Sequence, residues 1–473
     1  MPLLVALDRA IQSRLPARAL FRLGWSFGFV FFLIGTHWIA LLSDVAITVP
    51  WLKYPAWAAA AAYLALFPGL ATLLTGVLCR RARVPLALGF PVVFLAVEAL
   101  RASGELGFPW FQPGYTQQGY LPLVQLASLG SVTLVTLWVL ILNALLWRAW
   151  ATRRTIFAVA ALALLAAPWA WGSAVLARAP RRAGPEVALI QGNVAGEIKW
   201  SGKHQGQILG TFLRLSAEAA HRRPRPAIAI WPETATGSYL AKQLDQRLQV
   251  ASFAARESLP VFAGYADYSF DSTGHPLYRN AAGLFQPDGR LDGPYAKRHL
   301  VPFGERMPFE SLFPALGTIE LGQAEWTPGR EVRLFPSAAG AFTCLICFEA
   351  IFPDLAREDV RRGARWLVNV TNDEWFGNGA ALQQHAAMAV FRAVENHVSL
   401  ARCANTGLTL ATDGWGRELG RLPVFREGVL VTALPPPGPP TPFTAAGDWP
   451  ATLALIGAAA LALRALTARE PRG

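Results

Sequence analysis

The chain has 473 residues, 53% of them hydrophobic and only 16% charged, and its formal net charge is +12. Soluble domains carry about 25% charged residues, so this composition argues against a wholly soluble protein and places part of the chain in lipid. The Arg residues stand at the ends of apolar runs and form no basic stripe interleaved with aromatic residues, which argues against single-stranded nucleic acid as a partner and for charges that flank a membrane.

Six apolar runs are interpreted as membrane spans, because a helix needs about 20 residues to cross a bilayer. They lie at residues 24–42, 56–78, 86–100, 121–147, 156–176 and 449–463. The third run tolerates Glu98 near its end, and the last is short and rich in Ala. We therefore expect an α-helical transmembrane bundle formed by residues 1–179, with one more span near the C-terminus.

Arginine clusters beside these runs predict their orientation. Clusters precede the first run and follow the second, fourth and sixth: Arg9, Arg14, Arg18 and Arg22; Arg80, Arg81 and Arg83; Arg148, Arg153 and Arg154; Arg464, Arg469 and Arg472. In a six-span arrangement these clusters share one side, and the preference of positive residues for the cytoplasm makes that side the inner one. Residues 180–445 are then expected outside. Arg178, Arg181 and Arg182 oppose this orientation, but large domains cross a membrane largely regardless of charge.

Residues 180–434 follow a different pattern, in which short apolar runs alternate with helical stretches. The expected strands lie at 187–190, 227–231, 261–264, 341–346 and 366–370, and two expected helices lie at 207–221 and 383–396. This alternation is typical of an α/β layered domain. Five prolines then predict a stiff linker before the last apolar run, so that residues 435–473 form a third segment: Pro435, Pro436, Pro437, Pro439 and Pro440.

Three reactive side chains, Glu233, Lys297 and Cys347, stand at or near the ends of expected strands, where α/β folds build their sites. A thiol attacks a carbonyl best as the thiolate and needs a base to activate it. A carboxylate can take that proton and return it to the leaving group, and a fixed cation can stabilise the oxyanion. Together the three residues predict acyl transfer through a cysteine.

Each of these residues also has an ordinary structural interpretation, and only their joint occurrence favours chemistry. Glu233 is compatible with a solvated loop, Lys297 with a basic surface turn and Cys347 with a buried structural thiol. Cys344 and Cys347 also form a Cys-x-x-Cys pair, which is compatible with zinc, a redox site or a disulfide. A zinc site would need a second ligand pair at a sensible spacing, and the sequence offers none. An offset of three residues in a strand points the two thiols to opposite faces, so a Cys344–Cys347 disulfide is not expected either.

The motifs together resemble the nitrilase (carbon–nitrogen hydrolase) superfamily over residues 185–435. The matching segments are Trp231-Pro232-Glu233, Lys297 with Pro302-Phe303-Gly304-Glu305, Cys347-Phe348-Glu349, and Thr371-Asn372-Asp373-Glu374-Trp375-Phe376-Gly377. The resemblance implies an αββα sandwich and a catalytic triad. Glu233 would be the general base, Lys297 the oxyanion stabiliser and Cys347 the nucleophile.

The flanking segments narrow this resemblance to the apolipoprotein N-acyltransferase family. They are Gly24-Trp25 with His37-Trp38, the stretch 107–115, and Gln191-Gly192-Asn193 followed by Lys199-Trp200. In that family a nitrilase domain lies outside the bacterial inner membrane, in the periplasm, between the last two spans. The resemblance implies further essential glutamates at Glu305 and Glu349, a substrate entrance at Trp200, and substrate contacts from Phe348 and Trp375.

Two features depart from the family pattern. Phe348 stands where the family usually has Tyr, so any role of the hydroxyl is lost, although the backbone N–H can still serve the oxyanion. The family often has two further short spans at the N-terminus, and this chain begins near what would be the third. His385 is interpreted as a residue of a helix face rather than as part of the site.

The function implied by the resemblance is a ping-pong acyl transfer. An acyl chain would pass from a membrane phospholipid to Cys347 as a thioester, and then to the N-terminal amine of a diacylglyceryl-cysteine lipoprotein. The partners would be the phospholipid donor, the diacylated apolipoprotein and the bilayer, with no cofactor and no metal. The alternatives are a membrane-tethered amidase of the same superfamily and a non-catalytic scaffold. The membrane domain favours the transferase, because a small soluble amide needs no lipid-facing entrance.

Overall fold

The computed structural model describes residues 1–42, 50–181, 183–318 and 325–467. They form two compact units: a helical unit that contains Met1–Leu41, Trp51–Arg178 and the chain from Ala446, and a mixed unit that contains Ala179–Ala445. Arg182, Arg469 and Arg472 of the predicted clusters lie outside the described residues.

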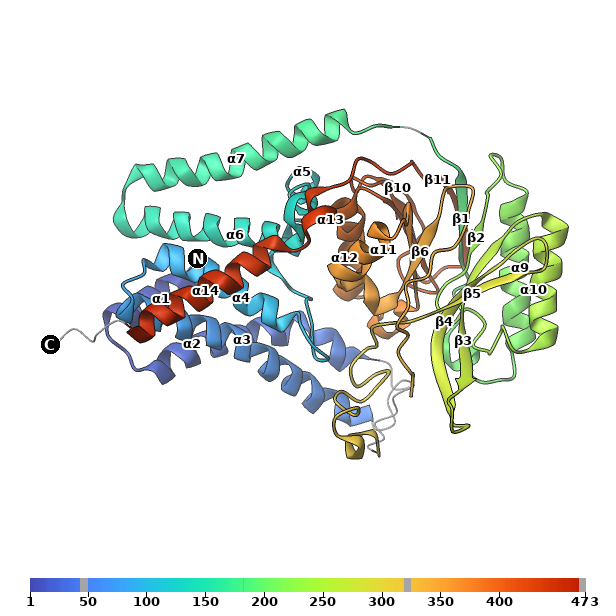
Figure 1. The fold of residues 1–473 in the computed structure, drawn as a ribbon, viewed down its shortest axis with the longest axis horizontal. Coiled ribbons are helices and arrows are strands. Elements are labelled where there is room, and N and C mark those ends of the chain that lie inside the picture. The colour runs from blue at the N-terminus through green and yellow to red at the C-terminus, as the bar shows by residue number, and fades with distance from the viewer. Residues whose placement is uncertain (43–49, 182, 319–324, 468–473) are drawn as a thin grey trace. The chain divides into compact units, whose positions relative to one another are not determined.

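The helical unit consists mainly of long apolar helices (Figure 1). Its long helices are α1 (Pro2–Gln12), α2 (Ala17–Gly35), α3 (Lys53–Arg81), α4 (Leu86–Arg101), α6 (Ala127–Thr152), α7 (Thr155–Arg178) and α14 (Trp449–Thr467). Short helical turns lie between them: η1 (His37–Leu41), η3 (Pro50–Leu52), η4 (Pro113–Gln117) and α5 (Leu121–Val124). Among the described residues, five segments are long and apolar enough to cross a membrane: α2 with η1, α3, α6, α7 and α14.

Three helices differ from the expected spans. The helix of the first span begins at Ala17 rather than at residue 24, because the Arg side chains of its first turns extend out of the helix without breaking it. The third expected span coincides with α4, which has 16 residues and is shorter than the five segments above, so its crossing of the membrane stays a prediction. A further helix, α1, was not expected; it buries the stripe Leu3, Leu4, Leu7 and Ala10.

The fourth expected span, 121–147, is interrupted. A short helix, α5, precedes α6, and α6 itself contains non-helical backbone at Gly130 and Ser131, where Ser131 has a φ of 65°. The helix α14 fills this break: Trp449 Nε1 donates to the carbonyl oxygen of Leu129 at 2.8 Å, and Thr133 donates to Asp448 at 2.6 Å. A carbonyl that leaves the helical ladder thus finds a partner on the last helix.

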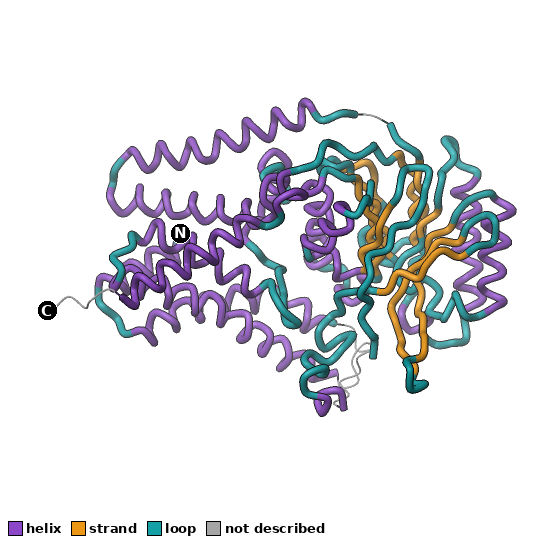
Figure 2. The backbone as a smooth tube through the Cα atoms, viewed as in Figure 1, coloured by secondary structure: helices purple, strands orange, loops and turns teal. Residues whose placement is uncertain are grey.

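The mixed unit contains two sheets (Figure 2). The six-stranded sheet has the order β11-β1-β2-β3-β4-β5, from β1 (Glu186–Gln191), β2 (Ala229–Ile230), β3 (Val261–Phe270), β4 (Pro276–Phe285), β5 (Leu291–Ala296) and β11 (Gly428–Ala433). The five-stranded sheet has the order β10-β9-β8-β7-β6, from β6 (Phe342–Ile346), β7 (Trp366–Thr371), β8 (Ser399–Ala404), β9 (Leu410–Thr412) and β10 (Glu418–Arg421). Within each sheet the neighbours β1, β2 and β3, and β6, β7 and β8, run parallel.

Helices cover the outer face of each sheet (Figure 1). The helices α9 (Gln205–Ala220) and α10 (Leu244–Glu257) pack on the first sheet, while α11 (Pro353–Arg361) and α12 (Ala380–Asn396) pack on the second. The inner faces of both sheets share one apolar core, to which Ile230, Phe262, Ile346 and Cys403 contribute. The expected αββα sandwich is confirmed. The shorter elements are α8 (Gly196–Lys199), α13 (Pro442–Ala446), η5 (Pro314–Thr318), η6 (Cys347–Ile351) and η7 (Asp373–Phe376).

The Pro-rich segment after β11 lies along the mixed unit and is held there by hydrogen bonds. Ser399 donates to the carbonyl oxygen of Pro435 at 2.8 Å, and the amide of Gly438 donates to the carbonyl oxygen of His397 at 2.8 Å.

Candidate active site

Glu233 stands in the loop that follows β2, and the surrounding backbone fixes it closely. The preceding Trp231 is fully buried and donates to Ser216 at 2.9 Å, which anchors the start of the loop. Thr234 has a φ of 42°, so the chain turns sharply after the glutamate. Strand β3 passes close by at Gly264, where a Cβ would lie 2.6 Å from the carbonyl oxygen of Pro232. Glycine is needed there because a side chain would displace the glutamate loop.

Lys297 follows β5 and reaches two carboxylates. Its Nζ lies 2.8 Å from Glu305 Oε1 and 3.7 Å from Glu233 Oε1, and the residue is 1% exposed. Burial alone lowers the pKa of Lys297, but the charges of Glu305 and Glu233 outweigh it and hold the pKa above its ordinary value. The amine therefore stays charged inside the domain. Glu305 is itself held by the amide of Val301, which donates to Oε2 at 2.9 Å.

Two further buried residues complete this part of the site. Asn280 on β4 donates to Glu233 Oε1 at 2.7 Å and to Glu305 Oε1 at 3.3 Å, so one amide group bridges the two carboxylates. Lys199, at the end of α8, donates to the backbone carbonyl oxygen of Glu233 at 3.1 Å, and burial lowers its pKa to about 8. A lone Asn in an apolar strand carries no pattern that would have marked it, and the motif that contains Lys199 gave this residue no role.

Cys347 lies at the junction between β6 and η6. The strand ends at Ile346, where the sequence predicted its end, and Cys347 has a φ of 50°. A positive φ at a strand–helix junction is a conformation that residues other than glycine seldom adopt and that often occurs at functional sites. The residue as a whole is partly exposed, although its thiol is desolvated. Burial raises its pKa, the charge of Glu233 raises it further, and the charge of Lys297 opposes both, so the resting group is a thiol.

Glu349 does not face the thiol; its carboxylate binds the backbone around the site. It is fully buried and accepts hydrogen bonds from the amides of Ile346 at 2.7 Å, Arg298 at 2.6 Å and His299 at 3.2 Å. The hydroxyl of Tyr295 donates to both of its oxygens. One carboxylate therefore joins the segment before Cys347 to the segment after Lys297.

The three aromatic residues predicted to meet substrate lie in different surroundings. Phe348 is 7% exposed and packs edge-on against Phe352, with ring centroids 5.3 Å apart. Trp200, at the end of α8, is 47% exposed, and Lys199 lies over its ring at 5.9 Å. Trp375 lies in η7 and is partly exposed. Trp200 is thus the most accessible of the three.

The four cysteines all lie in described segments and are free thiols. Cys344 is fully buried in the core between the two sheets, and Cys347 packs against that core while remaining partly exposed. Across the described ranges, no group of three His, Cys, Asp or Glu side chains is arranged to hold a metal ion.

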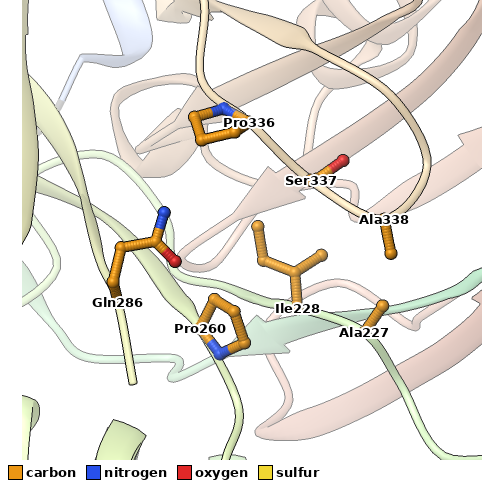
Figure 3. Close-up of a pocket in the computed structure, with 7 residues that line it drawn as sticks. All are labelled: Ala227, Ile228, Pro260, Gln286, Pro336, Ser337 and Ala338. Atoms are coloured by element: carbon orange, nitrogen blue, oxygen red, sulfur yellow. The ribbon is translucent and has the colours of Figure 1, made fainter. Parts of the chain in front are cut away.

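A separate cavity of about 280 Å³ lies at the ends of β2 and β6 opposite to Glu233 and Cys347 (Figure 3). It is lined by Ala227, Ile228, Pro260, Gln286, Pro336, Ser337 and Ala338. These residues precede β2, β3 and β6 or follow β4, whereas Glu233 and Cys347 follow β2 and β6. Its one hydroxyl, that of Ser337, donates to the carbonyl oxygen of Gly340 at 2.6 Å, and no carboxylate, amine, imidazole or thiol lines the cavity. The candidate site is therefore the cluster around Glu233, Lys297 and Cys347.

Two family models match the chain. Residues 1–145 match the apolipoprotein N-acyltransferase N-terminal domain, and residues 186–438 match the carbon–nitrogen hydrolase domain.

Relatives at about one-third identity extend over nearly the whole chain. An apolipoprotein N-acyltransferase of Geobacter metallireducens is 35% identical over 91% of this chain and 82% of its own length. Those of Caulobacter vibrioides and Brucella melitensis are 34% and 35% identical, over 96% and 93% of this chain and 87% and 85% of their own lengths. Among solved structures, an amidase from a Nesterenkonia species matches 55% of this chain and 93% of its own, at 19% identity and a TM-score of 0.41.

Proposed function

The chain belongs to the apolipoprotein N-acyltransferase family, and we propose that it carries out that acyl transfer through a thioester on Cys347. The acyl chain comes from a phospholipid and ends on the N-terminal amine of a diacylglyceryl-cysteine lipoprotein. The observation that carries this proposal is the meeting of three side chains from three strand ends, with the Lys297 amine 3.7 Å from the Glu233 carboxylate beside the Cys347 turn.

Acylation begins with proton transfer, because the raised pKa of Cys347 leaves it as a thiol at rest. Glu233 takes the thiol proton as Sγ attacks the ester carbonyl of the phospholipid, which gives a tetrahedral oxyanion. The charged Lys297 and the backbone N–H of Phe348 stabilise that oxyanion. When the carbon–oxygen ester bond breaks, Glu233 returns the proton to the departing lysophospholipid oxygen, and the acyl group remains on sulfur.

The second half-reaction uses the same groups in the opposite direction. The amine of the lipoprotein attacks the thioester carbonyl, and Glu233 accepts a proton from the amine. Lys297 again stabilises the oxyanion. The carbon–sulfur bond then breaks, Cys347 leaves as a thiolate that regains the proton from Glu233, and an amide is formed.

The neighbouring glutamates act on position rather than on the substrate. Glu305 holds the Lys297 amine at 2.8 Å, and Asn280 ties Glu305 to Glu233, so the cation and the base keep a fixed separation. Glu349 holds the backbone on both sides of the site. Preorganised groups of this kind spare the reaction the cost of orienting them.

The aromatic residues around the site suit a lipid substrate. The exposed Trp200 is proposed to meet the incoming acyl chains, with Phe348 and Trp375 closer to the thioester. Acyl transfer must outrun hydrolysis, and a bound, aligned amine reaches an effective molarity of about 10⁵ M or more. An acceptor anchored in the bilayer by two acyl chains meets that requirement, whereas a soluble amine does not.

The membrane orientation is proposed from the arginine clusters. They favour cytoplasmic termini for a bacterial inner-membrane protein, with the nitrilase-like domain of residues 180–434 in the periplasm between the bundle of residues 1–179 and the segment 435–473. Lipoprotein amino groups that have crossed the membrane are then within reach of Cys347.

Incubation of the purified protein with phospholipid alone tests the proposal. It should add one acyl chain in a hydroxylamine-labile linkage, and the adduct should persist in buffer until a diacylglyceryl-cysteine peptide is added. Cys347→Ala should lose the adduct and turnover, while Cys344→Ala, a change of a neighbouring core thiol, should keep both. An adduct on Cys347→Ala would refute the nucleophile. Rapid loss of the thioester to water, with no acceleration by the lipopeptide, would instead favour a membrane-tethered amidase.

A further inference from the structure

A buried histidine supports the turn that carries the nucleophile. His385 lies on α12 and is 1% exposed. Its Nε2 lies 3.1 Å from the backbone carbonyl oxygen of Cys347. Because a carbonyl oxygen can only accept, the hydrogen of this bond must be carried by Nε2. The imidazole therefore donates to the backbone of the residue whose thiol is proposed to react.

Asp373, Arg402 and Thr371 hold the histidine in this orientation. His385 Nδ1 lies 3.0 Å from Asp373 Oδ1 and 3.2 Å from Nη2 of Arg402. Arg402 donates to the other oxygen of Asp373 at 2.6 Å, and Thr371 donates to Oδ1 at 2.7 Å. All four side chains are at most 1% exposed. Such a closed and desolvated set of hydrogen bonds has little freedom to rearrange, so it is a rigid support for the turn.

The nucleophile needs support because of its backbone conformation. With a φ of 50°, Cys347 occupies the left-handed region, which residues other than glycine adopt only where the surroundings hold them. The direction of Sγ follows from this φ. If the turn relaxed to a negative φ, the thiol would swing away from Glu233 and Lys297.

The same hydrogen bond also fixes the amide that follows. The carbonyl of Cys347 and the N–H of Phe348 belong to one planar trans peptide unit and point in opposite directions. A donor held on the oxygen fixes the plane of that unit. It also polarises the N–H, because hydrogen bonds in a chain strengthen one another. In the acylation step proposed above, this N–H and Lys297 together meet the oxyanion.

We propose that His385 is a positioning residue for acylation, which acts through the backbone carbonyl of Cys347 rather than on the substrate. This inference rests on the proposed function. The geometry separates it from a second general base: Nε2 faces a carbonyl oxygen, Nδ1 faces Asp373, and the ring is 1% exposed, so neither nitrogen reaches a reacting atom.

The test compares two substitutions that differ in one donor. His385→Leu keeps an apolar side chain of similar size but removes the bond to the Cys347 carbonyl. His385→Gln places an amide N–H near the position of Nε2. Each full-length variant is purified in detergent, and single-turnover formation of the acyl-enzyme is followed with a phospholipid that carries a fluorescent acyl chain. The rate at saturation, the half-saturating concentration, the pH profile and the unfolding temperature are measured.

The expected result is a split between rate and affinity. His385→Leu should lower the saturated acylation rate about 100-fold, the scale of losing one oxyanion donor, while the half-saturating concentration changes less than about threefold. His385→Gln should recover the rate to within about tenfold of the parent protein. The midpoint of the pH profile should stay where it lies in the parent protein. If His385 served only folding, His385→Gln would not restore the acylation rate. The half-saturating concentration would then also change.

His397 provides the matched control on the same helix. It lies at the C-terminal end of α12, where its Nδ1 is 3.3 Å from the carbonyl oxygen of Pro439. His397→Leu and His397→Gln change the same kind of side chain, and both should acylate at the parental rate.

Three results would overturn the inference. A folded His385→Leu protein that acylates within about threefold of the parent rate would show that the bond has no kinetic role. A shifted pH midpoint in His385→Gln would point to proton transfer instead. If His385→Leu does not fold, the inference would be overturned by a His385→Gln protein that folds but acylates more than about 100-fold more slowly than the parent protein.

Alkylation separates this failure from that of the proposed function. If the parent protein forms no acyl-enzyme at all, the proposed function fails, but iodoacetamide still reports on the turn. Cys347 in His385→Leu should then be alkylated at least about tenfold more slowly than in the parent protein, because Glu233 no longer meets the thiol. Equal alkylation rates would refute the positioning role.

Discussion

Glu349 accepts a hydrogen bond of 2.6 Å from the backbone amide of Arg298. The glutamate two positions after the proposed nucleophile thus holds the residue next to the proposed oxyanion cation. One carboxylate thus joins the Cys-Phe-Glu and Lys-Arg-His segments, with 51 positions between Glu349 and Arg298 in the sequence.

Glu349→Gln should disturb both motifs at once. Glutamine offers one acceptor oxygen where the carboxylate offers two, and its NH₂ group would face amide donors that need an acceptor. Each unsatisfied buried donor costs about 1–3 kcal/mol, so we expect a lower unfolding temperature and a loss of acylation of about 100-fold. The exposed Glu427→Gln, which removes only a surface ion pair with Arg214, should change neither. Normal acylation by Glu349→Gln would contradict the role of Glu349 in holding the two motifs together.

Lys297→Arg should fold but acylate very slowly. The amine is a compact point charge 2.8 Å from Glu305, and a planar guanidinium cannot occupy the same place. The expected loss is about 100- to 1000-fold in the single-turnover rate, the usual cost of a lost oxyanion donor. The exposed Lys203→Arg is the control and should behave as the parent protein. A Lys297→Arg protein with near-normal rates would require a different oxyanion donor.

Gly264→Ala should damage the site more than the fold. The added Cβ would lie 2.6 Å from the carbonyl oxygen of Pro232 and 2.8 Å from Glu233 Cα, and backbone atoms on both sides cannot move apart without shifting the base. Overpacking of this kind costs about 1–3 kcal/mol, and we expect acylation to fall more than tenfold. Gly210→Ala on α9 meets open space and should leave the rate unchanged while raising the unfolding temperature slightly. If Gly264→Ala and Gly210→Ala acylated at equal rates, the loop that carries Glu233 would tolerate the displacement.

The domain should lose stability in mild acid partly through His299. Its ring packs 3.9 Å from the ring of Phe352, and burial, with help from the charge of Lys297, lowers its pKa to about 4. Between pH 6.5 and pH 4 the unfolded chain takes up a proton that the folded chain does not, so stability is full above this window and falls as the pH drops through it. The contribution is of the order of 2 kcal/mol.

Unfolding temperatures measured from about pH 7 to about pH 4.5 check this sign. His299→Phe keeps an aromatic ring against Phe352 and should flatten the decline, whereas His221→Phe at an exposed position should leave it unchanged. A decline that is equally steep in both variants would assign the acid sensitivity to other groups.

The orientation is open to a direct measurement. Reporters that are active only in the periplasm should be active when fused near Pro437 and inactive when fused at Gly473, because the arginine clusters favour cytoplasmic termini. A cytoplasmic reporter should give the reverse pattern at the same two positions. If the two patterns were exchanged, Cys347 would lie on the wrong side of the membrane for exported lipoproteins.

The sequence predicted the layered fold because β1, β2, β3, β6 and β7 are continuous apolar runs. It missed β4, β5, β8, β9, β10 and β11. The edge strands β10 and β11 are only partly buried or exposed and so lack an apolar run, whereas β8 is fully buried but its apolar run is interrupted by Arg402. The break at Gly130 was also invisible, because glycine and serine inside an apolar run are compatible with an unbroken helix.

The candidate site was predictable as motifs but not as geometry. Glu233, Lys297 and Cys347 stand in short polar clusters that spacing alone brings to strand ends. Asn280 was missed because its role comes from the pairing of β3 with β4 and from the approach of Glu305, which no local pattern encodes. His385 looked like an ordinary helix-face residue, since its partner is a backbone carbonyl 38 positions away.

The break in α6 makes the order of synthesis matter. The carbonyl of Leu129 receives its partner from Trp449, a residue made 320 positions later, and Asp448 on the same segment binds Thr133. A ribosome must therefore complete the whole mixed unit before the helix that supplies these partners exists. During that interval neither contact between α6 and the last helical segment can form.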